Sequence, residues 1–250
     1  MRVLILGGTT EANALAAWLA RDARFDPIFS LAGRTKTPTL PGIRSRIGGF
    51  GGPERLADYL RGEAIDVLID ATHPFAEQIS AHAVTAASAT KTPLAVFGRG
   101  AWVPSPGDRW RDFPNAQAAA RGLGKNSRRV FLTLGRLQLA AFEAAPEHDY
   151  LVRTIDTPDP MPNLPHHRLL LARGPFSFDE ELKLMRDARI EVLVSKNSGG
   201  SATRAKLDAA RVLGIDVMLI SRSKNTNTST FETIEDVFIF LEQQLHRLSS

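Results

Sequence analysis

Cysteine is absent from the 250-residue sequence, which excludes disulfide bonds and thiolate metal ligands. Long hydrophobic runs are also missing, because no stretch approaches the roughly 18 apolar residues that a membrane-spanning helix needs. The apolar run near the N-terminus, Val3–Leu6, ends at two glycines and is too short for the core of a secretory signal. We therefore expect a cytoplasmic protein with no membrane partner.

Blocks of positive charge are scarce as well. The net charge is +4 and the pI is about 9.7, but the arginines are scattered and no aromatic-rich RNA-binding motif occurs. We expect no nucleic-acid partner, since this basic balance also suits a small polyanionic molecule. No serine stands in a G-x-S-x-G elbow. His166 and His167 are neighbours without a third ligand at a suitable spacing, so we expect no metal site.

What the sequence does contain is a repeated alternation of short apolar runs and helical patterns. This alternation predicts parallel βαβ units, and hence an α/β protein. The predicted strands are Arg2–Leu6, Pro27–Leu31, Asp66–Ile69, Pro93–Phe97 and Arg129–Leu134. The predicted helices are Thr10–Ala20, Pro53–Arg61, Phe75–Ala89 and Gln138–Ala145.

Two stretches, residues 66–99 and 191–222, share one plan. Each opens with an acid and an apolar strand, continues with a polar loop and an alanine-rich helix, and closes with a second strand and an arginine. The segments 110–123 and 230–245 then each add a short strand and a helix. We predict two Rossmann-like domains with mostly parallel sheets. Their loops should face one cleft, because such sheets bind ligands beyond the carboxyl ends of their strands.

The first strand-to-helix loop contains Gly7, Gly8, Thr9, Thr10 and Glu11. A dinucleotide phosphate would bind here, at the N-terminus of the following helix. The loop departs from the G-x-G-x-x-G fingerprint, because Thr9 replaces the second glycine. An ordinary turn is therefore the alternative interpretation.

The second strand ends near Ser30 and is followed by Gly33, Arg34 and Thr35. NAD enzymes commonly carry an acid here, which accepts hydrogen bonds from the ribose hydroxyls, and this sequence has none. A guanidinium binds phosphate through two parallel hydrogen bonds, so the site favours the 2′-phosphate of NADP. A solvated surface arginine is the alternative.

Two further loops follow strands of the first half. Residues 48–52 include Gly49, Phe50 and Gly51, and we predict that they cover the cofactor, with a flexible connection as the alternative. Thr72 and His73 follow the third strand. We predict that His73 contacts cofactor or substrate. A role as general acid is the weaker interpretation, and a structural histidine is another.

In the second half, Lys196, Asn197, Ser198, Gly199 and Gly200 lie between an apolar strand and a helix. An ammonium group together with backbone N–H groups near a helix N-terminus favours an anion. A helix cap without a ligand is the alternative.

The segments LILGGTTEA, SLAGRT, GGFGG, DATHPFA and SKNSGG followed by ATRAKLDAA occur in this order from Leu4 to Ala210. Together they resemble the precorrin-6A reductase family, the NADPH-dependent enzymes of cobalamin biosynthesis. The resemblance implies two Rossmann-like domains, with the exchange of a strand as an option. It implies NADP binding by residues 1–124 and substrate binding by residues 125–250.

The same resemblance implies hydride transfer from NADPH to a double bond of a tetrapyrrole, giving precorrin-6B. The substrate carries many carboxylates, which the Lys196 loop would bind. We add Thr203, Arg136, Arg153 and Arg173 to this substrate site, and we take neighbouring pathway enzymes as candidate partners for substrate transfer. A cobalt-precorrin-6A reductase, a non-catalytic two-lobed sensor and a reductase of a small acid stay open as alternatives.

Overall fold

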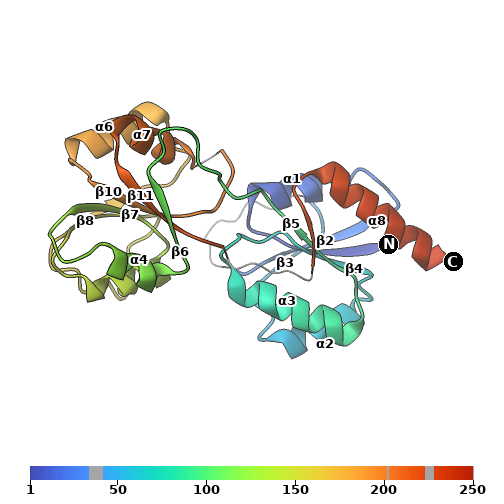
Figure 1. Ribbon diagram of the computed structural model, residues 1–250. Coiled ribbons are helices and arrows are strands. Elements are labelled where there is room, and N and C mark those ends of the chain that lie inside the picture. Colours follow the sequence, from blue (N-terminus) through green and yellow to red (C-terminus); the bar gives the residue numbers. More distant parts are fainter. Residues whose placement is uncertain (34–41, 202, 223–227, 250) are drawn as a thin grey trace. The chain divides into compact units, whose positions relative to one another are not determined.

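A computed structural model describes residues 1–33, 42–201, 203–222 and 228–249. The chain divides into two compact units, one formed by Met1–Gly100 with Lys224–Ser250 and the other by Ala101–Ser223. Each unit has a six-stranded parallel sheet with helices on both faces (Figure 1). None of the helices in the described residues combines the length and the apolar character of a membrane span.

The first unit contains a sheet in the order β12-β5-β4-β1-β2-β3. Its strands are β1 (Arg2–Leu6), β2 (Asp26–Leu31), β3 (Ser45–Ile47), β4 (Val67–Asp70), β5 (Leu94–Phe97) and β12 (Ser229–Phe231). The chain winds outward in opposite directions from β1 and β4. The loops that follow these two strands therefore flank the switch point where doubly wound sheets bind ligands.

Both faces of this sheet are covered, which explains why β1 is apolar throughout. Helices α1 (Thr10–Leu19) and α8 (Ile234–Ser249) lie on one face, and α2 (Pro53–Gly62) and α3 (Glu77–Thr90) lie on the other (Figure 1). Val3 and Ile5 pack in the core with α1 and α8, whereas Leu4 and Leu6 pack with α2 and α3. Alternate residues of a strand point to opposite faces, so a strand buried on both sides has no polar positions.

The second unit repeats this architecture, with its sheet in the order β6-β11-β10-β7-β8-β9. The strands are β6 (Trp110–Phe113), β7 (Arg129–Thr133), β8 (Asp149–Thr154), β9 (His167–Leu171), β10 (Val192–Lys196) and β11 (Asp216–Ile220). Here the switch point lies between β7 and β10.

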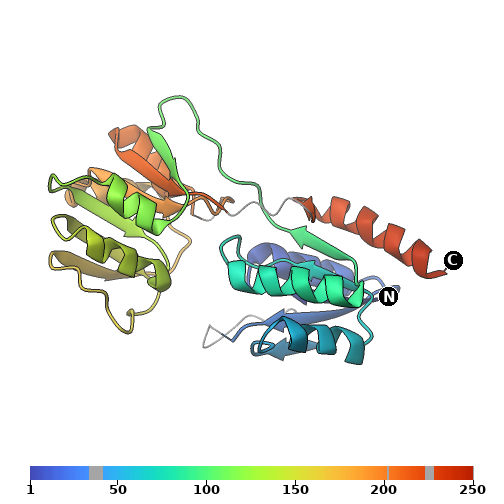
Figure 2. The ribbon, with the colours of Figure 1, turned by 60° about the horizontal axis from the view of Figure 1, so that its bottom comes forward.

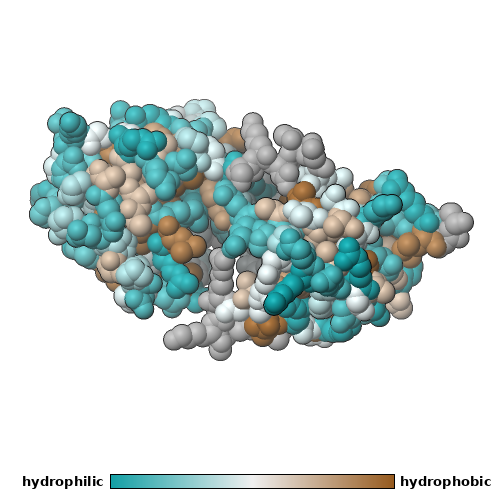
Figure 3. All heavy atoms as spheres, turned by 90° about the horizontal axis from the view of Figure 1, so that it is seen from below, coloured by the Kyte–Doolittle hydropathy of each residue, from teal (hydrophilic) through white to brown (hydrophobic). Residues whose placement is uncertain are grey.

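Helices again cover both faces of the second sheet. Helices α6 (Phe178–Asp187) and α7 (Ala205–Leu213) lie on one face, and α4 (Ala116–Gly122), α5 (Arg136–Leu139) and the 3₁₀ helix η1 (Ala140–Ala144) lie on the other (Figures 1 and 2). Phe131, Leu193, Met185 and Leu207 form part of the core between the sheet and α6 and α7. On the face drawn in Figure 3, hydrophobic residues form only small patches among hydrophilic ones.

The two units exchange one edge strand each, β6 and β12. Strand β6 follows β5 in the chain, yet it pairs with β11 of the second sheet, where Trp110 lies opposite Val217. Strand β12 follows β11, yet it pairs with β5 of the first sheet, where Ser229 lies opposite Ala95. The predicted α/β fold with two Rossmann-like domains and an exchanged strand is therefore confirmed.

The compact units differ from the predicted domains 1–124 and 125–250. Residues 101–124, which include β6 and α4, belong to the second unit, and residues 228–249 belong to the first. The exchange is the reason, because both tails share the same pattern of a short strand and a helix. That pattern does not specify which sheet a tail joins. The cofactor and substrate roles of the two domains stay predictions.

Candidate functional site

Thr9 connects the two loops at the switch point of the first sheet. Its hydroxyl donates to the carbonyl of Ala71, directly after β4, at 2.8 Å. The same oxygen accepts from the N–H of Ala12 at 3.0 Å, which makes Thr9 the N-cap of α1. The threonine that replaces the second glycine of the fingerprint thus has a structural role at this position.

The start of α1 fits a phosphate group. A Cβ atom on Gly7 would lie 2.3 Å from the Phe29 ring, so only glycine allows the chain to pass β2 this closely. Gly8 and Thr10 are exposed beside this turn, and Glu11 belongs to the first helical turn. The first N–H groups of a helix have no intrahelical acceptor and carry partial positive charge, which favours an anion.

The end of β2 is held by Arg46, a residue that sequence reasoning missed. Its guanidinium donates to the Ser30 hydroxyl at 2.8 Å and to the Gly49 carbonyl at 3.4 Å. It also stacks 3.8 Å from the centre of the Phe50 ring, and burial lowers its pKa. Gly33 and Gly51 are exposed in this region.

The predicted phosphate ligands Arg34 and Thr35 lie outside the described residues. Their placement beside Ser30 and Arg46 therefore rests on the sequence alone. The structure places one cation, Arg46, at this end of the sheet.

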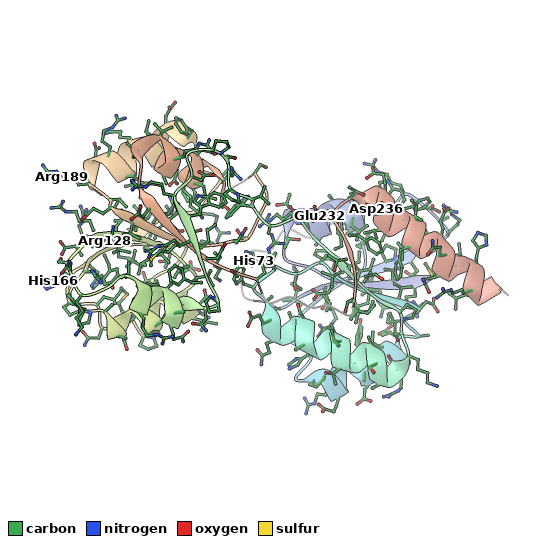
Figure 4. All side chains as sticks on the ribbon, in the orientation of Figure 1. His73, Arg128, His166, Arg189, Glu232 and Asp236 are labelled. Atoms are coloured by element: carbon green, nitrogen blue, oxygen red, sulfur yellow. The ribbon has the colours of Figure 1, made fainter. Side chains whose placement is uncertain are left out.

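The loop after β4 is fixed by a buried carboxylate. Asp70 accepts from both the N–H (3.1 Å) and the hydroxyl (2.6 Å) of Thr72. His73 Nδ1 accepts from the N–H of Phe75 at 3.2 Å, and the His73 carbonyl accepts from Ala76 N–H at 2.7 Å. Figure 4 shows His73 at the end of the first sheet where its strands terminate. These contacts give His73 a structural role beside its predicted contact with a ligand.

Glu11 meets a second residue that the prediction did not name. Arg99, two residues after β5, donates to the Glu11 carboxylate at 3.2 Å. Arg222 has the corresponding place after β11 and donates to the Asn197 carbonyl at 2.8 Å. The arginine that closes each repeat of the sequence was the signal for both positions.

The switch point of the second sheet carries a cation, whereas that of the first sheet carries a glycine turn followed by a capped helix. Lys196 is the last residue of β10, and its ammonium lies close to Gly135 in the loop after β7, where a Cβ atom would be 3.4 Å away. Thr133 joins these two strands by donating to the Val194 carbonyl at 3.1 Å. Lys196 is half-buried.

The rest of this loop is clamped by Trp102. The Asn197 side chain exchanges two hydrogen bonds with the Trp102 backbone, at 2.7 and 3.0 Å, and the Trp102 indole donates to the Gly200 carbonyl at 2.8 Å. Gly199 and Gly200 have φ angles of 68° and 75°, which side-chain-bearing residues rarely adopt. Ser198 is buried, and Thr203 lies in the turn before α7.

The three predicted arginines of the second unit differ in burial. Arg136, at the start of α5, and Arg173, after β9, are both exposed. Arg153 in β8 is only 7% exposed and pairs with the buried Glu181 of α6. The structure thus leaves Arg136 and Arg173 accessible, whereas Arg153 is held inside the unit.

A pocket of about 430 Å³ lies at the amino ends of strands in the second sheet, opposite to the loops that follow the strands. It is lined by residues at the starts of β7, β8 and β9, among them Arg129, Asp149 and His167. Figure 4 shows His166 and Arg128 at this end of the sheet. The pocket is remote from the loops that follow the strands, so it takes no part in the candidate site. Among the described residues, no group of His, Asp and Glu is placed to hold a metal ion.

The two units define a class of protein, in which two doubly wound parallel sheets each carry an anion-compatible loop at the switch point. The particular family follows from the whole chain. The chain belongs to the precorrin-6x reductase CbiJ/CobK family, whose model matches residues 2–242. The chain is therefore an oxidoreductase, and the predicted family is confirmed.

The similarity to curated relatives extends over nearly the full length of this chain. A precorrin-6A reductase of Rhodococcus erythropolis is 49% identical over 94% of this chain and 94% of its own length. One of a Sinorhizobium species is 47% identical over 94% of this chain and 90% of its own length. The solved structure of a CobK precorrin-6A reductase superposes with a TM-score of 0.89 at 44% identity, covering 98% of this chain and 97% of that one.

A cobalt-precorrin-6A reductase of Priestia megaterium is 27% identical over 97% of this chain and 98% of its own length. The chain is therefore more similar to the precorrin-6A reductases described above than to this cobalt-precorrin-6A reductase. The family assignment favours the precorrin-6A reductase interpretation over the sensor and the reductase of a small acid.

Proposed function

We propose that the chain reduces a double bond of precorrin-6A with NADPH, giving precorrin-6B in cobalamin biosynthesis. The family match and the relatives at 47% and 49% identity support the reaction and its tetrapyrrole substrate. The assignment of cofactor to the first unit and substrate to the second rests on the contrast between the two switch points. The first has a capped helix start at Thr9, and the second has the ammonium of Lys196.

NADPH would supply the hydride, and the first unit would hold it. The N–H groups at the start of α1 would bind the pyrophosphate, with Gly7 and Gly8 allowing its close approach. Arg34 and Thr35, with Ser30, would contact the 2′-phosphate. The Phe50 ring, supported from one side by Arg46, and the loop with Thr72 and His73 would complete the site. The protein's contribution is orientation and electrostatics.

The second unit would hold the substrate carboxylates. Lys196 and the backbone N–H groups around Gly199 and Gly200 suit carboxylates, and the accessible Arg136 and Arg173 add positive charge. The net charge of +4 also favours a polyanionic substrate. Neighbouring pathway enzymes that deliver or accept the macrocycle are the proposed partners.

Parallel assays with NADPH and NADH test this function. With precorrin-6A, the wild-type protein should oxidise NADPH in preference to NADH. Arg34→Ala should weaken NADPH binding roughly ten- to a hundredfold, because a charge-assisted contact is lost, and should leave NADH nearly unchanged. Equal weakening of both cofactors would remove Arg34 from the 2′-phosphate site. Absence of turnover with either cofactor would contradict the proposed reaction.

A further inference from the structure

The second unit contains a buried cluster of charged side chains beside the Lys196 loop. Arg153 of β8, Glu181 of α6 and Lys206 of α7 are 7%, 1% and 6% exposed. Arg153 donates to Glu181 Oε1, and its guanidinium lies 3.8 Å from the centre of the Phe176 ring. The Lys206 ammonium lies 5.7 Å from the centre of the Trp102 ring. These residues come from a strand, two helices and the segment that clamps the loop.

The cluster is not balanced in charge. It contains one carboxylate, that of Glu181, and the cations Arg153 and Lys206, with Lys196 near enough to repel Lys206. Within the described residues, Lys206 makes no hydrogen bond or ion pair, and Glu181 Oε2 is buried without a hydrogen-bond partner. Burying an unpaired cation is costly, and such groups concentrate at functional sites.

The position of the cluster is that of a ligand site. Arg153 and Lys196 lie at or next to the carboxyl ends of β8 and β10, and Lys206 lies in the first turn of α7, which follows the Gly199–Gly200 loop. Ligands of doubly wound sheets bind at this edge. Trp102 contacts both parts, because its indole donates to Gly200 while Lys206 lies over its ring.

We propose that Lys206 is the inner cation of a carboxylate-binding site in the second unit, with Lys196 as its outer cation. Arg153 pairs with Glu181 Oε1, so it acts as a positioning residue for this carboxylate. The proposal rests on the proposed function, because the carboxylate is one of those on the tetrapyrrole substrate. It adds a binding residue that the motif around Lys196 did not include.

The site has a consequence for protons. Burial, followed by repulsion from Arg153, lowers the pKa of Lys206 to about 7, against the opposing effect of Glu181, and Lys196 lowers it further. A bound carboxylate favours the charged ammonium and so raises this pKa. Binding above about pH 7 should therefore take up a proton, and the affinity should fall as the pH rises.

Calorimetric titration of wild type, Lys206→Met and Lys206→Arg with precorrin-6A and, separately, with NADPH tests the proposal. Between about pH 6 and pH 9, wild-type affinity for precorrin-6A should fall as the pH rises, with proton uptake visible as a dependence of the heat on the buffer. Lys206→Met should bind precorrin-6A roughly ten- to a hundredfold more weakly near pH 6 and show no proton uptake. NADPH binding should be unchanged.

Lys206→Arg keeps a charge that does not titrate in this range, so it should bind precorrin-6A with little dependence on pH. It decides the question if Lys206→Met does not fold, because a pH dependence equal to that of wild type would then overturn the proposal. The control is Lys183→Met, which removes a lysine of α6 that is 77% exposed and should behave as wild type.

Wild-type affinity, pH dependence and proton uptake in a folded Lys206→Met would overturn the role of Lys206. Because wild-type turnover is measured independently, this result would leave the proposed function intact. A wild-type protein that neither binds nor reduces precorrin-6A would contradict the proposed function itself, and the inference with it.

Discussion

Among single residues, Thr9 makes two hydrogen bonds through its hydroxyl that an apolar side chain of the same shape could not make. Thr9→Val keeps the shape, loses both hydrogen bonds, and should lower the free energy of unfolding by about 1–2 kcal/mol while weakening NADPH binding. Urea unfolding and NADPH titration measure the two effects. Thr9→Ser retains the hydroxyl and should stay close to wild type. A Thr9→Val protein of unchanged stability would show that the cap is unimportant.

Lys196 tests which unit holds the substrate. Lys196→Ala should weaken precorrin-6A binding about ten- to a hundredfold and leave NADPH binding nearly unchanged. Gly199→Val should be more damaging, because a β-branched residue resists the φ of 68°. Separate titrations of the two ligands measure this, with the exposed Lys125→Ala as control. Loss of NADPH binding alone would mean that the roles of the units are reversed.

Lys206 also predicts a pH dependence of stability. Its pKa is lowered from 10.5 to about 7, mainly by burial, so between these values the unfolded state binds more protons than the folded state. Wild-type stability should therefore rise from pH 7 toward pH 10.5, relative to Lys206→Met, by at most about 1.4 kcal/mol per pH unit. Urea unfolding of both proteins across this range measures the difference. A difference that is constant with pH would contradict the buried, titrating lysine.

At the scale of elements, the exchanged C-terminal segment should stabilise the first unit. Leu241 of α8 is fully buried in the core with α1 and β1, whereas Ile239 of the same helix is 54% exposed. Leu241→Ala should lower the free energy of unfolding by about 2–5 kcal/mol, and Ile239→Ala should have little effect.

Hydrogen exchange resolved by peptide checks where this destabilisation occurs. Leu241→Ala should speed exchange in β1 and α1 and leave β7 and β10 unchanged. Faster exchange in β7 and β10 alone would show that α8 stabilises the second unit.

Where ranges were predicted from the hydrophobic pattern, most agree closely with the helices and strands. No range was predicted for β3, β8, β9 or α6, and the predicted helix Gln138–Ala145 is divided between α5 and the 3₁₀ helix η1. The predicted strand Arg2–Leu6 matches β1, and the predicted helix Thr10–Ala20 matches α1 to within one residue. The predicted helix 75–89 corresponds to α3 at 77–90, because residues 74–76 form a turn around the His73 carbonyl. The sheet that β6 or β12 joins could not be predicted, because a strand of three or four residues carries little information about which strand it pairs with.

The candidate site was predictable in its loops and less so in its supporting side chains. Glycines and hydroxyls stand directly after strands and Lys196 ends β10, where the sequence pattern marks them. Arg46 and Glu181 act through tertiary contacts that no local pattern reveals. Lys206 did leave a signal, because it stands three and four residues before the buried Ala209 and Ala210 and so shares their helical face.

At the scale of the whole molecule, two units of one architecture differ in the chemistry of their switch points. The first offers a helix start capped by Thr9, and the second offers Lys196 with the buried cations behind it. The predicted cleft that both sets of loops would face stays a prediction. This contrast supports the proposal that hydride passes from a cofactor on the first unit to a macrocycle on the second.

Transfer of deuterium from labelled NADPH measures whether hydride passes from the cofactor to the macrocycle. Wild-type protein is incubated with precorrin-6A and NADPH carrying deuterium at the transferable position of the nicotinamide, and the reduced macrocycle is examined by mass spectrometry. We predict stoichiometric consumption of NADPH and one deuterium in the product, and no deuterium in the macrocycle when the protein has been boiled. Consumption of NADPH without deuterium in the macrocycle, or binding of both ligands without turnover, would contradict the proposal.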